Sequence, residues 1–171
     1  MSRQLLGSLL AGLLLAATAA PAVRAADADV IREAKDRADI DVLIWRYVQA
    51  LDNVDVDAYP TFFTEDGSIC CEHDHTYKGR TEIRRLLQEV KDSRAAAQAR
   101  GETVPRMYHP IFNSHIEFRS KDHAHIDSYW FTVMAEQPPN GAPKVVLVGR
   151  CADEVVRVAG RWLIQSRNVF P

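Results

Sequence analysis

An aspartate and a histidine are the residues of this sequence best suited to acid–base chemistry. Asp52 ends a stretch in which apolar residues recur with helical spacing, and His109 begins a later strand-like stretch. A carboxylate at the edge of an apolar helical face is poorly placed for solvation, so we expect His109 to be its partner. A carboxylate bonded to one imidazole nitrogen makes the other nitrogen a better base for removing a proton from carbon. The alternative is that Asp52 only caps or solvates the helix end and His109 is an ordinary strand residue.

The helix that carries Asp52 is predicted over residues 36–52. At about 100° per residue, an arc of roughly 160° holds Tyr47, Ile40, Leu51, Ile44, Val48, Asp52 and Trp45. Tyr47 is a candidate donor to a substrate oxygen, or else a core tyrosine with a satisfied hydroxyl. Trp45 is expected to line a pocket.

Residues 1–25 have the pattern of a secretion signal. Arg3 precedes an apolar run over residues 5–20, and Ala22-Val23-Arg24-Ala25 offers a small-residue cleavage site. We therefore expect a secreted or periplasmic chain that begins near Ala26 and has no contact with membrane after cleavage. The alternative, an uncleaved membrane anchor, is disfavoured because the run is short.

The remaining residues, 26–171, suit one domain with a sizeable core. The formal net charge of −2 becomes two charges more negative without Arg3 and Arg24, which argues against a nucleic-acid partner. Cys70, Cys71 and Cys151 are an odd number of thiols, so at least one is unpaired or bridges two chains. We favour three small buried cysteines, while a bridge from Cys151 to one of the others stays open.

Helical signals come first along the chain, and strand signals follow. A second short helix is expected over residues 55–63, a turn at 65–67, a strand at 68–72, and a third helix, capped by Thr81 and stopped by Gly101, to about Arg100. Long strands are predicted at 109–119, 125–136, 144–158 and 162–169, with turns at 120–122, 138–141 and 159–160. This order predicts an α+β fold, with a curved antiparallel sheet against about three N-terminal helices and a hollow between them.

Several local motifs occur in an order that resembles one superfamily. They are Arg46-Tyr47-Val48-Gln49-Ala50-Leu51-Asp52, Phe63-Thr64-Glu65-Asp66-Gly67, Tyr77-Lys78-Gly79-Arg80, Tyr108-His109 with Asn113, Gly149-Arg150-Cys151-Ala152-Asp153-Glu154, Gly160-Arg161-Trp162 and Arg167. The chain from about residue 36 to 170 thereby resembles the cone-shaped NTF2-like, or SnoaL-like, proteins. Within them it is most similar to scytalone dehydratase, bile-acid 7α-dehydratase and hexachlorocyclohexane dehydrochlorinase.

The resemblance implies that Asp52 and His109 form a catalytic pair and that Tyr47 binds a substrate oxygen. It also implies that Arg157 stabilises departing charge, although a plain surface cation is an equal alternative. Steroid isomerases share the first helix, but Cys71 occupies the position of their proton-shuttling carboxylate, which counts against that chemistry.

The remaining candidates depend on which way the strands face. Asn113 shares the predicted strand face of His109 and is a candidate for substrate binding. Phe63, Tyr129 and Phe131 are candidates for lining the pocket. Asp153 is expected to be inward-facing and paired with Arg161 or Arg167 in a structural role.

Two His-x-His pairs, His73/His75 and His123/His125, invite a metal interpretation because imidazole suits zinc or copper. Both pairs are expected in solvated loops or turns, so we predict no metal site and no cofactor.

Taken together, the sequence predicts a cofactor-independent lyase of dehydratase type acting on a small hydrophobic or cyclic molecule. A homo-oligomer, dimer or trimer, is expected through the exposed sheet. A non-catalytic ligand-binding module and an isomerase or cyclase are the alternatives.

Overall fold

The structure, a computed structural model, describes residues 19–71, 75–135 and 141–170. The chain divides into two units, residues 1–39 and 40–171, and helix α1 (Ala19–Asp52) runs through the boundary. Most of the proposed signal, residues 1–18, lies outside the described residues, and residues 19–25 belong to α1. None of the helices in the described ranges has the length and apolar character needed to cross a membrane.

The part of α1 in the second unit buries a stripe of apolar side chains. Ile40, Leu43, Tyr47 and Ala50 are buried, at the i, i+3, i+7 and i+10 spacing of one helical face. Trp45 lies on the opposite side and is 60% exposed. The expected placement of Trp45 in the pocket is therefore wrong, because the buried arc is centred on Leu43 and Tyr47.

A short 3-10 helix, η1 (Tyr59–Phe62), replaces the α-helix expected over residues 55–63. Asp55 Oδ1 accepts hydrogen bonds from the backbone N–H groups of Asp57 and Ala58 at 3.2 and 3.0 Å. These bonds, with that from the Tyr59 N–H to the Asp55 carbonyl at 3.0 Å, hold a single turn. The turn leads into η1, where Tyr59 is buried.

Strand β1 (Phe63–Cys71) continues through residues 65–67, where a turn was expected. Its pairing with β7 (Arg161–Phe170) is parallel and shifts register between Phe63 and Ser68. A Cβ at Gly67 would lie 3.0 Å from the carbonyl oxygen of Ile164. Gly67 therefore serves a close approach between two strands and not a chain reversal.

Helix α2 (Arg80–Ala99) begins after Gly79 at φ 80° and has no side-chain cap, so Thr81 lies inside its first turn. It ends before Gly101, whose φ of 79° is the left-handed conformation predicted for a helix stop. Ile83 and Leu87 are buried. Leu86 and Val90 are half-buried beside them.

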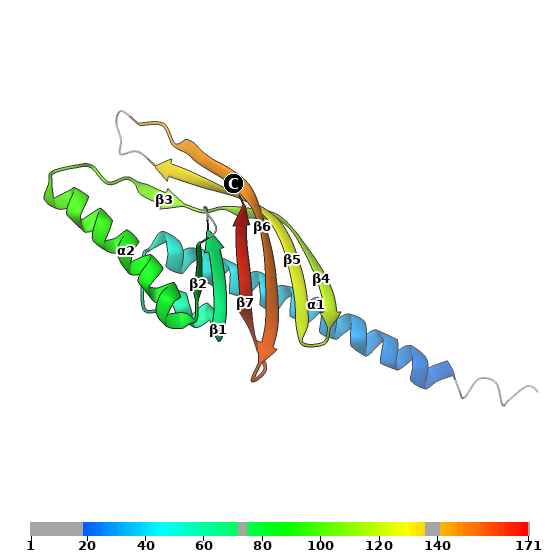
Figure 1. The fold of residues 1–171 in the computed structure, drawn as a ribbon. Helices are drawn as coiled ribbons and strands as arrows, with labels where there is room; N and C mark the ends of the chain where they lie inside the picture. Colours follow the sequence, from blue (N-terminus) through cyan, green and yellow to red (C-terminus); the bar gives the residue numbers. More distant parts are fainter. Residues whose placement is uncertain (1–18, 72–74, 136–140, 171) are drawn as a thin grey trace, which may run out of the picture. The chain divides into compact units, whose positions relative to one another are not determined.

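One sheet of seven strands completes the second unit (Figure 1). Its order is β2-β1-β7-β6-β5-β3, and β4 also pairs with β5. The remaining strands are β2 (His75–Lys78), β3 (Arg106–Tyr108), β4 (Ile111–Ser120), β5 (His123–Ala135) and β6 (Lys144–Val158). The α+β class with a curved sheet is confirmed, and the described residues contain two α-helices and one 3-10 helix where three helices were expected.

The inward face of the sheet joins the helices in one core. Ala124, Ile126, Ser128, Trp130 and Thr132 alternate along β5 as buried residues, and side chains between them are more exposed. Gly149 on β6 lets the sheet close over Trp130, because a Cβ there would lie 2.9 Å from the indole and 2.0 Å from the Phe170 carbonyl.

Candidate functional site

A cavity of about 260 Å³, here called the inner cavity, lies between the inward face of the sheet and the helices of the second unit. Most of its wall is apolar, with a few polar groups, as in many small-molecule sites. It is lined by Tyr47, Leu51, Tyr59, Ile69, Leu86, Leu87, Val90, His109, Ile111, Trp130, Thr132, Leu147, Cys151, Arg167 and Val169.

His109 and Asp52 are in direct contact at the wall of the inner cavity. The Nδ1 atom of His109 lies 2.7 Å from Asp52 Oδ1, and the backbone N–H of His109 donates to the same oxygen at 3.1 Å. Both side chains are largely shielded from solvent, with exposed fractions of 19% and 17%. A carboxylate acceptor at Nδ1 places the proton there, which leaves Nε2 as the basic nitrogen.

The position of His109 follows from the proline after it. His109 and Pro110 lie between β3 and β4, because Pro110 has no N–H to donate to the sheet. The proline also holds His109, the residue before it, in an extended conformation. The carbonyl of Pro110 accepts a hydrogen bond from the N–H of Phe131 at 3.1 Å, which ties this connection to β5. The histidine is thereby fixed opposite the end of α1.

Tyr47 belongs to a second polar group in the wall. Its hydroxyl lies 3.0 Å from the hydroxyl of Tyr59, and the guanidinium of Arg167 stacks over its ring at 4.5 Å from the centroid. All three side chains line the inner cavity. An oxygen of a bound molecule would therefore meet phenol and guanidinium donors in an apolar surrounding.

Arg167 is a fully buried cation whose charge is balanced by Asp153. One guanidinium nitrogen donates to Asp153 Oδ2 at 2.8 Å, and the other to Cys151 Sγ at 3.1 Å. Burial raises the pKa of Asp153 to about 6 against the opposing effect of Arg167. Burial alone would lower the pKa of Arg167, but the charge of Asp153 outweighs it and keeps the guanidinium protonated. The expected Asp153–Arg167 pairing is confirmed.

The cysteines differ in exposure. Cys70 and Cys151 are free, Cys151 is buried and Cys70 is only partly buried, so the expectation of three buried thiols is wrong for Cys70. The side chain of Cys71 lies outside the described residues. Burial raises the pKa of the Cys151 thiol, which disfavours a thiolate nucleophile in the cavity.

The other residues expected to line the pocket lie elsewhere. Phe63 is fully buried and packs against Tyr47 and Tyr59, with ring centroids 5.9 Å from each, one layer behind the cavity wall. Tyr129 and Phe131 occupy the outward positions of β5, and Tyr129 is 50% exposed. Their expected place in the hollow is wrong, because the buried residues of β5 are the even-numbered ones.

Asn113 is also outside the inner cavity. It is exposed, with φ of 53°, within a register shift between Phe112 and His115 on β4. Alternation counted from His109 fails here, because Pro110 interrupts the strand and the irregularity adds a residue.

Arg157 lies near the end of β6 that turns into β7, and it does not line the inner cavity. Its Nε donates to Asp122 Oδ1 at 3.1 Å, and its guanidinium stacks over Trp162 at 4.4 Å from the centroid. The structure gives it a packing role at the end of β6, outside the inner cavity, so its expected place at the substrate is wrong.

The histidine pair on β5 binds a carboxylate on the outward face of the sheet. His123 Nε2 and His125 Nδ1 lie 2.6 and 2.8 Å from the two oxygens of Glu154. The hydrogen bond to Glu154 raises the pKa of His125. His73 lies outside the described residues, and among those described no group of three or more histidine, cysteine or acidic residues is placed to hold a metal.

Sequence reasoning missed much of the cavity wall, including Arg167 as a wall residue. A signal for part of it exists in β5, where the even positions from 124 to 132 hold small or apolar residues and the odd positions from 123 to 127 hold histidine and aspartate. This contrast favours the even face as the inward one, and it would have assigned Trp130 and Thr132 to the cavity.

Solved structures share this fold. A candidate scytalone dehydratase from Novosphingobium aromaticivorans has a TM-score of 0.66 at 19% identity, covering 82% of this chain and 86% of that one. An NTF2-like protein with a cystatin-like fold from the same organism has a TM-score of 0.68 at 21% identity, covering 83% of this chain and 85% of that one. ActVI-ORFA from Streptomyces coelicolor has a TM-score of 0.66 at 23% identity, covering 78% of this chain and 95% of that one. At these identities the likeness establishes the fold alone.

No protein of curated function matches the chain. A family model does match it, that of the SnoaL-like domain, over residues 32–168. The matched range includes α1 from residue 32, the Asp52–His109 contact and almost the whole sheet. The chain belongs to the SnoaL-like domain family, with the NTF2-like α+β fold.

Proposed function

We propose that the chain is a cofactor-independent lyase of dehydratase type, acting on a small hydrophobic or cyclic molecule. The observation that carries this proposal is the 2.7 Å contact between His109 Nδ1 and Asp52 Oδ1 at the wall of a mostly apolar cavity. A non-catalytic ligand-binding module has no need of a histidine oriented by a carboxylate at its cavity wall. The contact between these two residues therefore supports the catalytic alternative.

The proposed reaction begins with proton transfer from a carbon beside a carbonyl group to Nε2 of His109. The electron pair of the broken C–H bond forms a carbon–carbon double bond, and the C–O bond on the neighbouring carbon breaks. The departing hydroxide takes the proton from the imidazolium and leaves as water, which returns His109 to its neutral state. Asp52 stabilises the imidazolium between these two steps.

Tyr47 and Arg167 are the proposed oxygen-binding groups. Negative charge develops on the carbonyl oxygen while the C–H bond breaks, and donors fixed in an apolar wall stabilise such charge strongly. Tyr47 is held by Tyr59 and by the stacked guanidinium, so little reorganisation is needed during the reaction. The NTF2-like fold is compatible with many chemistries, so these roles depend on the geometry of the cavity and not on the fold.

The test is turnover of a panel of cyclic β-hydroxy ketones followed by mass spectrometry. The wild type is expected to release one water, and His109→Ala to be slower by about 10²- to 10⁴-fold with an unchanged melting temperature. His115→Ala, which alters an exposed histidine of β4, is the matched control. Product of unchanged mass would favour an isomerase or cyclase. Tight binding without product, or loss of folding together with activity, would overturn the proposal.

Self-association through the outward face of the sheet is part of the proposal. That face exposes apolar side chains that a monomer would leave in water, including Tyr129, Val148 and Phe170 at 50%, 55% and 49%. We expect a dimer or trimer by analytical ultracentrifugation, and a monomer for Tyr129→Lys combined with Val148→Lys. A monomeric wild type at high concentration would exclude it.

The proposed location is outside the cytoplasm, from the signal-like residues 1–25. Intact-mass measurement of the exported protein is expected to give a chain that begins near Ala26. A chain that retains Met1 and stays in the cytoplasm would contradict this part of the proposal.

A further inference from the structure

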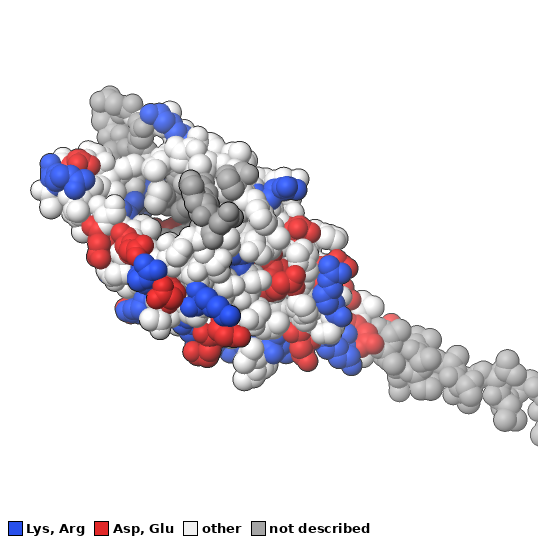
Figure 2. Space-filling model, in the orientation of Figure 1, with Lys and Arg blue, Asp and Glu red and all other residues white. Residues whose placement is uncertain are grey.

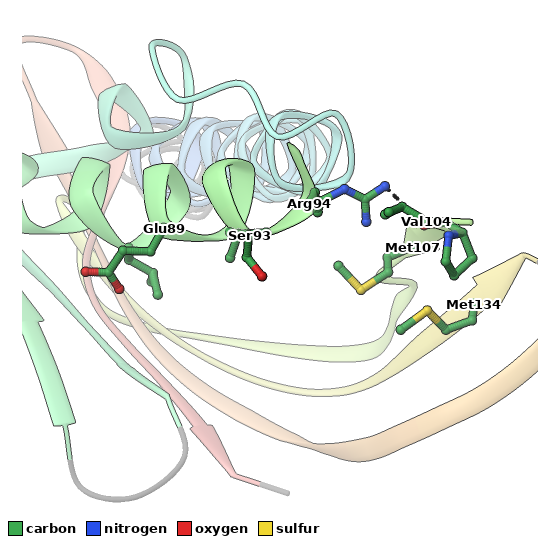
Figure 3. A pocket seen from close by; sticks show the side chains of 9 residues that line it. Glu89, Ser93, Arg94, Val104, Met107 and Met134 are labelled. Atoms are coloured by element: carbon green, nitrogen blue, oxygen red, sulfur yellow. Dashed lines mark hydrogen bonds between the residues drawn. The ribbon is translucent and has the colours of Figure 1, made fainter. Parts of the chain in front are cut away.

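A second hollow adjoins the inner cavity. This outer groove has a volume of about 460 Å³ and lies between α2 and the strand side of the unit (Figure 3). Met107 and Met134 line it on the strand side, and Ser93 and Arg94 line it on the helix side. The surface beside α2 is visibly hollowed (Figure 2).

Two side chains of α2 belong to both spaces. Leu86 and Val90 line the inner cavity and the outer groove, and both are only half-buried. These two side chains therefore form a partition where the inner cavity and the outer groove adjoin. Rotamer changes of exposed or half-buried side chains are fast, so such a partition is readily opened.

A third hollow continues from the outer groove and is basic. This basic depression has a volume of about 490 Å³ and shares Arg94 and Met107 with the groove. Lys91, Arg94 and Arg106 line it. Among the described residues none of these three cations has a carboxylate within ion-pair distance, and Arg94 donates a hydrogen bond to the carbonyl of Pro105 at 3.0 Å.

Three arginines nearer the start of α2 do form ion pairs with carboxylates. Arg80, Arg84 and Arg85 each pair with a carboxylate: Glu65 for Arg80, Asp57 for Arg84, and Glu82 and Glu89 for Arg85. Over this helix positive and negative side chains are interspersed (Figure 2). The basic depression is thus a local excess of positive charge on a chain whose formal net charge is −2.

Two acidic side chains also border these hollows. Asp52 lines the basic depression, but its Oδ1 already accepts two hydrogen bonds from His109. Glu89 lines the outer groove and is paired with Arg85. Neither carboxylate is within ion-pair distance of Lys91, Arg94 or Arg106 among the described residues. With three cations against Asp52, the basic depression keeps an excess of positive charge.

We propose that the inner cavity, the outer groove and the basic depression form one elongated site for an amphipathic molecule with an anionic end group. The reacting part lies beside His109, the apolar middle lies against Met107 and Met134, and the anionic end binds Lys91, Arg94 and Arg106. The flexible thioether side chains of the two methionines suit an apolar segment of variable shape. This inference rests on the proposed function for the identity of the reacting end, but not for the binding itself.

The test compares two fluorescent dyes that share an aromatic skeleton. The anionic probe is 8-anilinonaphthalene-1-sulfonate, and the neutral probe is N-phenyl-1-naphthylamine. In the variant Lys91→Gln/Arg94→Gln/Arg106→Gln, we expect the sulfonate dye to bind about tenfold more weakly, since its charge loses its partners, and the neutral dye to change less than about twofold. The matched control, Lys78→Gln/Lys121→Gln/Arg161→Gln, makes the same change in net charge at exposed positions and is expected to leave both affinities unchanged.

Further variants locate the bound dye. Met134→Trp fills the outer groove and is expected to weaken both dyes, and Val104→Trp serves the same purpose if the first variant folds poorly. His109→Asn is expected to keep dye binding while losing turnover, so failure of the proposed reaction and failure of this inference are distinguishable. Equal losses in the two triple variants, or unchanged binding when the groove is filled, would overturn the inference.

Discussion

One oxygen atom of Asp52, Oδ1, accepts two hydrogen bonds from a single residue, His109, through its backbone N–H and its Nδ1 atom. The backbone hydrogen bond fixes the position of the His109 main chain, and the ring hydrogen bond fixes the orientation of its imidazole. A general base needs both, because a small misplacement of the reacting nitrogen slows proton transfer greatly.

Asp52→Asn is the first variant to measure. The amide keeps an oxygen that accepts the same two bonds but removes the negative charge that stabilises the imidazolium. We expect kcat to fall by about 10²- to 10⁴-fold and the melting temperature to change by no more than about 3 °C. Asp41→Asn, at an exposed position of α1, controls for loss of charge. Full activity in Asp52→Asn would show that the carboxylate charge is not used.

Tyr47→Phe and Tyr59→Phe separate substrate binding from packing. Each variant breaks the same 3.0 Å contact between the two hydroxyls, so their stability losses should be similar, about 1 kcal/mol. If Tyr47 donates to the reacting oxygen, only Tyr47→Phe lowers kcat, by about tenfold or more. Equal kinetic effects in the two variants would assign the pair a structural role. Urea unfolding and steady-state kinetics on the same samples provide the comparison.

The buried carboxyl of Asp153 predicts a pH dependence of stability. Because burial raises its pKa from 3.8 to about 6, the folded protein holds this proton more tightly than the unfolded chain. The contribution of Asp153 to the free energy of unfolding is therefore most favourable below about pH 4 and declines, by of the order of 3 kcal/mol, as the pH rises through about 6. We expect the difference between wild type and Asp153→Asn, measured by urea unfolding, to decline over the same range. A constant difference would contradict this.

Substitution of Arg167, the ion-pair partner of Asp153, gives a second test of stability. Arg167→Met leaves Asp153 buried without its cation and is expected to cost about 3–5 kcal/mol. Adding Asp153→Asn removes the unpaired charge, so the double variant should be more stable than Arg167→Met alone. This outcome keeps the test informative even if a single variant is too unstable to study. Additive losses would mean that the 2.8 Å ion pair contributes nothing to stability.

The histidines on the outward face predict a different pH window. The hydrogen bond to Glu154 raises the pKa of His125, so this stabilisation is complete below about pH 6.5 and is lost as the pH rises above it. Burial opposes the effect, but hydrogen bonds from His125 and His123 lower the pKa of Glu154, so its contribution is present above about pH 4.5 and is lost as the pH falls. The cluster of His123, His125 and Glu154 is thus most stabilising near pH 5–6, where His125 is protonated and Glu154 is ionised.

His125→Gln is therefore expected to lose more stability at pH 5.5 than at pH 8.5. The difference should be below about 1 kcal/mol, because partly exposed pairs are screened by solvent. In a Glu154→Gln background the same substitution should have little further effect at either pH. Urea unfolding at both pH values checks this, and a larger loss at pH 8.5 would reverse the assignment.

The sequence was a good guide where periodicity and end signals agree. The helix ending at Asp52, the helix stopped by Gly101 and the four long strands were all expected, because apolar spacing over many residues is a strong signal. The poor solvation of Asp52 on its helix predicts a polar partner, and the order of motifs supports His109 as that partner. No local rule brings together two residues that are 57 positions apart.

The wrong predictions arose where contacts or irregularities of the folded chain decide the local structure. Gly67 marks a close approach of β1 to β7, and the same residue type is equally compatible with the turn expected there. Tyr129 and Phe131 look like pocket residues by type, but the register of β5 turns them outward. Asn113 follows a strand break at Pro110, after which alternation no longer counts from His109. The errors at Gly67, Tyr129 and Phe131 concern neighbours that are far away in the sequence, whereas the error at Asn113 concerns a local irregularity of the strand.

The parallel pairing of β1 with β7 has a consequence for synthesis of the protein. Arg167 and Val169 belong to the cavity wall, yet they lie in the final strand of the sheet. A nascent chain that has emerged from the ribosome as far as residue 160 already holds Asp52, His109 and Tyr47, but it has neither the cation nor the strand that separates β1 from β6. The wall of the inner cavity is therefore completed only by the last ten residues of the sheet, and a prematurely terminated chain is expected to lack the proposed oxygen-binding cation.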